Sequence, residues 1–190
     1  MLFGGAGYPG GFADARRSGY QGYLGHGAAR FYAKLGSMVI PPALKTYLIG
    51  GIAGTPTVMS RLAERITDWD ARSAPERFTY REALAHLADW DGVFGERIRR
   101  ILTEENPTLP DIDEGALAVE HDYANQDPLM IFERFEASRA DLVAQLQGLS
   151  EDDWHRVGHR EKVGDLNLLH LATMILGHDA YHIRQFSEAA

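Results

Sequence analysis

The chain has 190 residues, no cysteine and a formal net charge of −8. Its length fits one domain with a single core, and the lack of cysteine excludes disulfides, thiolate metal ligands and a cysteine nucleophile. The acidic balance disfavours nucleic acid, and neither a membrane span nor a signal peptide can be read in the sequence, so we expect a cytoplasmic protein without nucleic-acid or membrane partners.

Residues 1–40 are rich in glycine and show no sustained apolar period. A segment of this composition buries too little surface to offset its ordering entropy, so we predict a flexible extension followed by a domain over residues 41–190. Two other interpretations exist for residues 1–37. One is a nucleic-acid-binding arm, which the few arginines disfavour, and the other is a misassigned gene start with Met38 as the true initiator.

The first helical segment is predicted within residues 42–66, where several glycines between residues 50 and 54 weaken the middle. Thr55 followed by Pro56 resembles an N-cap with proline at the first helical position. One kinked helix and two short ones therefore both fit. The expected apolar face consists of Leu44, Leu48, Ile49, Ile52, Met59, Leu62 and Ile66.

The second helix is predicted over residues 79–102. Thr79 and Glu82 form a capping-box pattern at its start, and Asn106 with Pro107 stops it. Its apolar stripe recurs at helical spacing and consists of Ala83, Leu84, Leu87, Trp90, Phe94, Ile98 and Ile101.

A connection over residues 106–127 follows, and its length is typical of lids and binding loops. Asp127 and Pro128 cap a third helix that ends at Gly148, with an expected core face of Leu129, Phe132, Phe135, Leu142, Val143 and Leu146. Asn167 is the expected N-cap of the last helix. Because alternation never lasts beyond a few residues, no strand is predicted, and four amphipathic helices indicate an all-α four-helix bundle.

The last helix, residues 168–187, carries two histidines one turn apart. On a helical wheel His178 and His182 lie about 40° from each other, on the shoulder of the apolar face. Side chains at this spacing sit roughly 6 Å apart at Cβ, which suits two nitrogens that converge on a metal at about 2.1 Å. Such a pair needs a third ligand from elsewhere in the chain.

His86 is the candidate third ligand, because it lies at the border of the buried face of the second helix. Alone it would be interpreted as a half-buried imidazole bonded to a carbonyl, but beside the histidine pair it completes a three-nitrogen site with open positions, as in catalytic centres. The remaining five histidines are expected at the surface, in the long connection or in the N-terminal extension: His26, His121, His155, His159 and His170.

The sequence HDAYH also resembles the HExxH zinc-protease motif, with Asp179 in the place of glutamate. Aspartate is one methylene too short for that base, and no further ligand follows His182. Asp179 falls near the centre of the apolar stripe. It is therefore either a buried carboxylate paired with arginine or backbone donors, or a residue that supports the metal ligands.

Four segments together resemble the DinB/YfiT-like superfamily of four-helix bundles: LAHLADWDGVFGERI, NPTLP, YANQDP and GHDAYHIRQ. The resemblance covers about residues 44–190. It implies that His86, His178 and His182 bind a divalent metal such as zinc, nickel or iron, and that the protein forms a homodimer. It also implies a transferase that uses a low-molecular-weight thiol, such as mycothiol or bacillithiol, as cosubstrate.

Three functions are therefore compared: a metal-dependent enzyme that activates a small thiol or water for reaction with a small-molecule substrate, a non-catalytic metal-binding bundle that acts as a sensor or store, and a metal-free interaction module. No residue is assigned as a catalytic side chain. Candidates for contacts to the metal ligands or the substrate are Asp179, Asp89, Tyr123, Gln126 and Gln185.

Overall fold

The computed structural model describes residues 39–189 of the chain. The expectations for the N-terminal extension, including His26 and the possible start at Met38, lie outside these residues. Within the described range, no helix is long and apolar enough to cross a bilayer.

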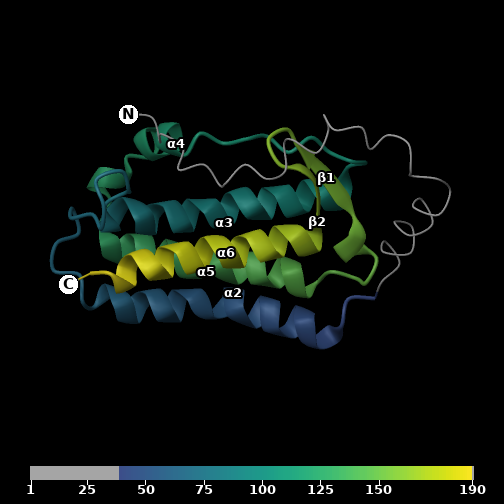
Figure 1. Ribbon diagram of the computed structural model, residues 1–190, viewed down its shortest axis with the longest axis horizontal. Helices are drawn as coiled ribbons and strands as arrows, with labels where there is room; N and C mark the ends of the chain where they lie inside the picture. Colours follow the sequence, from purple (N-terminus) through teal and green to yellow (C-terminus); the bar gives the residue numbers. More distant parts are fainter. Residues whose placement is uncertain (1–38, 190) are drawn as a thin grey trace, which may run out of the picture. The chain divides into compact units, whose positions relative to one another are not determined.

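Four long helices lie side by side and form the predicted all-α bundle (Figure 1). They are α2 (Pro42–Ala63), α3 (Tyr80–Thr103), α5 (Pro128–Gln147) and α6 (Leu168–Ser187). Helix α3 packs against α5 and α6, and α2 packs against the same two helices from the other side of the bundle. The fold class expected from the apolar stripes is therefore confirmed.

The predicted caps fix where these helices begin. Thr79 Oγ1 accepts a hydrogen bond from the Glu82 amide at 3.1 Å, and the Glu82 carboxylate accepts one from the Thr79 amide at 2.8 Å. Asp127 accepts from the Leu129 amide at 2.8 Å at the start of α5, and Asn167 caps α6. Each cap satisfies an amide that the first helical turn leaves unpaired.

Helix α2 is one continuous helix, so the alternative of a new start at Thr55 is wrong. Instead of capping, the Thr55 hydroxyl donates to Asp179 Oδ2 at 2.6 Å and links α2 to α6. A Cβ at Gly51 would lie 3.0 Å from the Leu176 side chain. Gly51, one of the glycines expected to weaken this helix, therefore permits the close approach of α6.

The connections contain further short elements: α4 (Glu114–Glu120), the 3-10 turns η1 (Tyr123–Asn125) and η2 (Asp153–His155), and the strands β1 (Val157–Arg160) and β2 (Gly164–Asn167). The strands pair antiparallel, with Gly158 opposite Leu166. The prediction of no strand is thus wrong. With four residues in each strand, the hairpin is too short to show alternation, and its pairing depends on backbone bonds rather than on a side-chain pattern.

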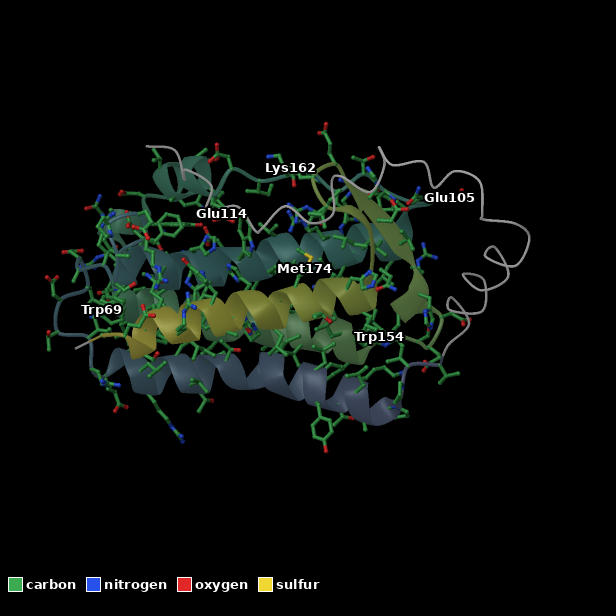
Figure 2. The ribbon with its side chains drawn as sticks, viewed as in Figure 1. Trp69, Glu105, Glu114, Trp154, Lys162 and Met174 are labelled. Carbon is green, nitrogen blue, oxygen red and sulfur yellow. The ribbon has the colours of Figure 1, made fainter. Side chains whose placement is uncertain are left out.

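The core fills the space between the four helices and confirms the predicted stripe of α3, all seven residues of which are buried. Trp154 lies at one end of the bundle and Trp69 at the other (Figure 2). Two expected core residues are wrong, because Leu44 and Leu129 are 47% and 66% exposed. Both belong to the first turn of a helix, where the neighbouring helices no longer cover the side chain.

Candidate metal centre

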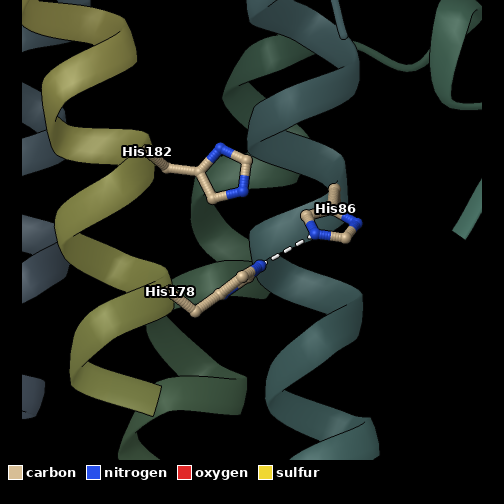
Figure 3. A group of neighbouring side chains, drawn as sticks. All are labelled: His86, His178 and His182. Atoms are coloured by element: carbon tan, nitrogen blue, oxygen red, sulfur yellow. Dashed lines mark hydrogen bonds between the residues drawn. The ribbon is translucent and has the colours of Figure 1, made fainter. Parts of the chain in front are cut away.

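Three histidines from two helices point toward one another in the bundle interior (Figure 3). His178 and His182 project from α6, one turn apart, and His86 projects from the facing side of α3. One potential ligand atom of each lies within 4.8 Å of the others, and Nε2 of His86 is 2.9 Å from Nε2 of His178. The bundle therefore brings together the three residues that the sequence singled out.

Aromatic rings enclose this histidine cluster. The Trp90 ring stacks on His86 with centroids 4.9 Å apart and planes inclined by 27°, and Phe78 approaches the same imidazole at 5.3 Å. Phe94 lies 6.0 Å from the His178 ring. His86 and His182 are only 2% and 3% exposed, whereas His178 is half-buried. The rings restrict rotation of the imidazoles and limit the access of water to them.

Gln185 fixes the orientation of one imidazole. Its amide nitrogen donates to the Phe78 carbonyl at 2.9 Å, so its oxygen Oε1 is left to accept from Nδ1 of His182 at 3.0 Å. With the proton on Nδ1, Nε2 of His182 carries the lone pair. A hydrogen bond from the outer ring nitrogen is the usual support for a metal-binding histidine.

Burial keeps the three imidazoles neutral. It lowers the pKa of His86 to about 3, with a further contribution from His182, and it lowers the pKa of His182 to about 4 against the opposing bond to Gln185. The pKa of His178 is also well below its ordinary value, first because of burial and then because of the two other imidazoles and Arg139. At neutral pH the cluster offers lone pairs rather than positive charges.

A divalent cation fits this donor set. In a tetrahedral site, two nitrogens bound to one ion at about 2.1 Å lie about 3.4 Å apart. The potential ligand atoms of the three histidines lie within 4.8 Å of one another, and those of His86 and His178 are 2.9 Å apart, so modest side-chain rotations bring all three to one ion. Nδ1 of His86, the ring nitrogen that does not face His178, is buried without a hydrogen-bond partner among residues 39–189, so this imidazole lacks the supporting bond that Gln185 gives to His182.

Asp179 belongs to a different polar cluster. Arg139 on α5 donates from Nη1 and Nη2 to the Asp179 carboxylate, and from Nε and Nη2 to Asp91 on α3 at 2.9 Å for each bond. Thr55 completes the partners of Asp179, and Arg139 also donates to the Ile52 carbonyl at 2.8 Å. Of the two interpretations of Asp179, the buried carboxylate paired with arginine describes its observed contacts.

Three other candidates lie on the outer side of α3, beside the long connection. Asp89 accepts from Tyr123 Oη at 2.8 Å, contacts His121 at 2.5 Å and forms an ion pair with Arg134 at 3.2 Å. Burial, followed by the bond to Asp89, raises the pKa of Tyr123, so its hydroxyl remains protonated. Gln126 Oε1 accepts from Arg134 at 3.0 Å.

The remaining histidines within the described range lie away from the histidine cluster. His121 bonds Asp89 rather than the site, and His159 bonds Asp165 at 2.7 Å in the hairpin. His170 is exposed in the first turn of α6, and His155 lies in η2.

The sequence analysis did not single out Arg139, nor the roles of Trp90 and Phe78 as walls of the histidine cluster. One signal for Arg139 was present, because it shares the helical spacing of the buried residues Phe135, Leu142 and Leu146. A charged residue in an apolar stripe requires a buried partner of opposite charge. Asp179, also in an apolar stripe, was that partner.

The fold and the histidine cluster together define a helical-bundle protein with the donor set of a metal site. The chain belongs to the DinB superfamily, whose family model matches residues 52–186. Among solved structures it is similar to YfiT from Bacillus subtilis, with a TM-score of 0.74, 23% identity, and coverage of 79% of this chain and 87% of that chain. YfiT is described as "a probable metal-dependent hydrolase with an unusual four-helix bundle topology". Comparison with curated proteins gave no significant match.

Proposed function

We propose that the protein is a metal-dependent enzyme in which His86, His178 and His182 bind one divalent cation. The observation that carries the proposal is the convergence of three neutral imidazoles from two helices, with two of their Nε2 atoms 2.9 Å apart. Three protein nitrogens leave positions for an external ligand, as in catalytic rather than structural sites. When bound, a divalent cation lowers the pKa of a thiol or water that it coordinates and so supplies a nucleophile at neutral pH.

The chain's own residues suit an anionic nucleophile. Neutral imidazoles leave the charge of a bound cation uncompensated, which favours a thiolate or hydroxide at the open position. Gln185 holds Nε2 of His182 toward the site, and the rings of Trp90 and Phe94 limit competing water. The absence of cysteine further favours an external nucleophile over one supplied by the protein.

We propose a low-molecular-weight thiol as that nucleophile, transferred to a small electrophile. Water is the alternative, since YfiT, similar in fold, is described as a probable metal-dependent hydrolase. Thiol transfer and hydrolysis would use the same three histidines, and they differ in whether a thiol or water takes the open position. A non-catalytic metal-binding bundle and a metal-free module are the outcomes that the following experiments distinguish.

Metal content tests the first step. Elemental analysis of purified protein should show one divalent ion per chain, and single alanine variants at His86, His178 and His182 should each lose most of it. The metal should also raise the melting temperature of the wild type but not of these variants. Full metal content in His86→Ala would contradict the three-ligand site, and a metal-free wild type under reloading conditions would favour the interaction module.

Turnover tests the second step. Metal-loaded protein should accelerate the reaction of a small thiol such as mycothiol, bacillithiol or glutathione with monochlorobimane, in which the sulfur displaces chloride and a proton is released, with a rate proportional to metal occupancy. An ester panel measures hydrolysis in parallel. Identical rates with metal-loaded protein, metal-free protein and His182→Ala across both panels would support the non-catalytic metal bundle instead.

A further inference from the structure

A pocket lies on the side of α3 away from the histidine cluster, lined by residues of α3, the long connection with α4, and α5. Its volume is about 500 Å³, within the range of small-molecule sites. None of the three imidazoles of the histidine cluster lines it. Its apolar wall consists of Ala88, Val93, Pro110, Ile112 and Leu117.

Arg97 lines this pocket with a buried charge that forms no contact ion pair among residues 39–189. The residue is 3% exposed, and its only hydrogen bond within the described chain runs from Nη2 to the Pro110 carbonyl at 3.2 Å. Its guanidinium also lies 5.9 Å from the Trp90 ring centroid and 5.8 Å from that of Phe94. These contacts are all with neutral groups, so they offset only part of the cost of burying a cation.

The carboxylates around Arg97 are already engaged by other cations. The ion pairs are Asp89 with Arg134, Glu96 with Arg99, Glu104 with Arg100, and Asp111 with Arg160. Burial, followed by repulsion from Arg160, lowers the pKa of Arg97 to about 10 against the attraction of Asp111, which leaves the guanidinium charged at neutral pH. Its Nε and Nη1 have no hydrogen-bond partner among the described residues, and they remain available to a ligand in the pocket.

We infer that this pocket binds a small organic anion whose carboxylate, or a related oxyanion, pairs with Arg97 while its apolar body lies against Val93, Ile112 and Leu117. A guanidinium presents parallel N–H donors that match an oxyanion, and such bonds strengthen where water is excluded. The volume admits a body of one or two rings. The Trp90 ring contacts both Arg97 and His86, so the pocket neighbours the histidine cluster without containing it.

Two fluorescent probes of similar shape test the inference. The probe 8-anilinonaphthalene-1-sulfonate carries an anionic group, and N-phenyl-1-naphthylamine is its neutral counterpart. The wild type should bind the anionic probe at least about tenfold more tightly than the neutral one, because a hydrogen bond to a charged group is worth that factor or more. Arg97→Gln should lose this preference, whereas Arg61→Gln, which removes an exposed charge from α2, should retain it.

Two further measurements separate the pocket from other sites and from misfolding. The variant His178→Ala should bind the anionic probe as the wild type does, because residue 178 does not line the pocket. Leu117→Glu should weaken anionic-probe binding, because it adds a negative charge to the pocket wall. This variant provides the test if circular dichroism shows that Arg97→Gln does not fold. Equal affinities for the two probes in the wild type, or unchanged anionic-probe binding in the folded Arg97 and Leu117 variants, would overturn the inference.

Discussion

Two clusters of polar side chains lie in the interior of the bundle, and they differ in whether their buried polar atoms have hydrogen-bond partners. The arginine cluster, Asp91, Arg139 and Asp179, joins three helices by bonds made entirely within the protein. The histidine cluster, whose member His178 directly precedes Asp179 on α6, leaves Nδ1 of His86 buried and without a hydrogen-bond partner among residues 39–189. The buried groups of the arginine cluster are therefore paired within the described residues, whereas the histidine cluster keeps one unpaired nitrogen.

This difference assigns the two clusters different expected roles: the arginine cluster stabilises the fold, and the histidine cluster is the proposed metal site. A buried charge network is stable only when every member is paired, and each helix that contributes a member is then held in register. Converging lone pairs stabilise nothing by themselves, and a cation bound to the Nε2 atoms would add an interaction that these side chains do not make with one another. We therefore expect changes in the arginine cluster to affect folding and changes in the histidine cluster to affect metal binding.

The largest effect is expected from Arg139→Met. The substitution leaves two carboxylates in the core without their shared cation, and we expect a loss of about 3–5 kcal/mol in the free energy of unfolding. Urea denaturation measures it. Arg99→Met, at an exposed ion pair on α3, is the control and should leave the midpoint unchanged. Full stability of Arg139→Met would show that the arginine cluster does not hold the helices together.

A smaller effect is expected from Gln185→Leu, which removes the acceptor for Nδ1 of His182 and frees the imidazole to rotate. Loss of such a supporting bond lowers metal affinity by about 10- to 100-fold. Competition with a zinc indicator measures the affinity. Gln147→Leu, at the exposed end of α5, should bind metal as the wild type does. Equal metal affinity in the two variants would show that Gln185 does not support the metal site.

The clusters should also differ in the sign of their response to pH in the metal-free protein. The unfolded histidines bind protons near pH 6.5, whereas folded His86 and His182 do so only near pH 3 and 4, so the unfolded state holds more protons between these values. Stability should therefore fall as the pH drops from 6.5 toward 4, by up to about 1.4 kcal/mol per pH unit for each histidine.

Asp91 opposes this trend. Burial raises its pKa to about 6 although Arg139 acts in the other direction, so its contribution to stability declines as the pH rises from about 4 to 6. Urea titrations in steps across this range should show a shallower slope in His182→Gln than in the wild type. The same slope in both proteins would mean that His182 titrates normally in the folded state.

The smallest effect is expected from His170→Ala. His170 is exposed in the first turn of α6, and its ring accepts only a long bond of 3.4 Å from the Asn167 amide, while the Asn167 cap itself uses the His170 backbone. Metal content should be unchanged, and the melting temperature should fall by little. A loss of metal would mean that a fourth histidine takes part in the site.

The fold class and the ends of most helices could be predicted from the sequence, because both follow from local rules. An apolar stripe must be buried, and capping boxes at Thr79 and Asn167 satisfy amides of their own helix turn. The pairing of His178 with His182 followed from helical spacing in the same way. These features depend on residues within about four positions of one another, so no tertiary information was needed.

Which residues far apart in the sequence contact each other depends on how the helices pack. The convergence of His86 with His178, separated by 92 positions, depends on how α3 and α6 pack. The role of Thr55 changed from a predicted cap to a partner of Asp179 because α2 runs unbroken past it. The hairpin formed by residues 157–167 exists through backbone pairing, which leaves little trace in four-residue strands. A sequence pattern can show that a polar residue will be buried and must be paired. It does not show which distant residue pairs with it, because that depends on how the helices pack.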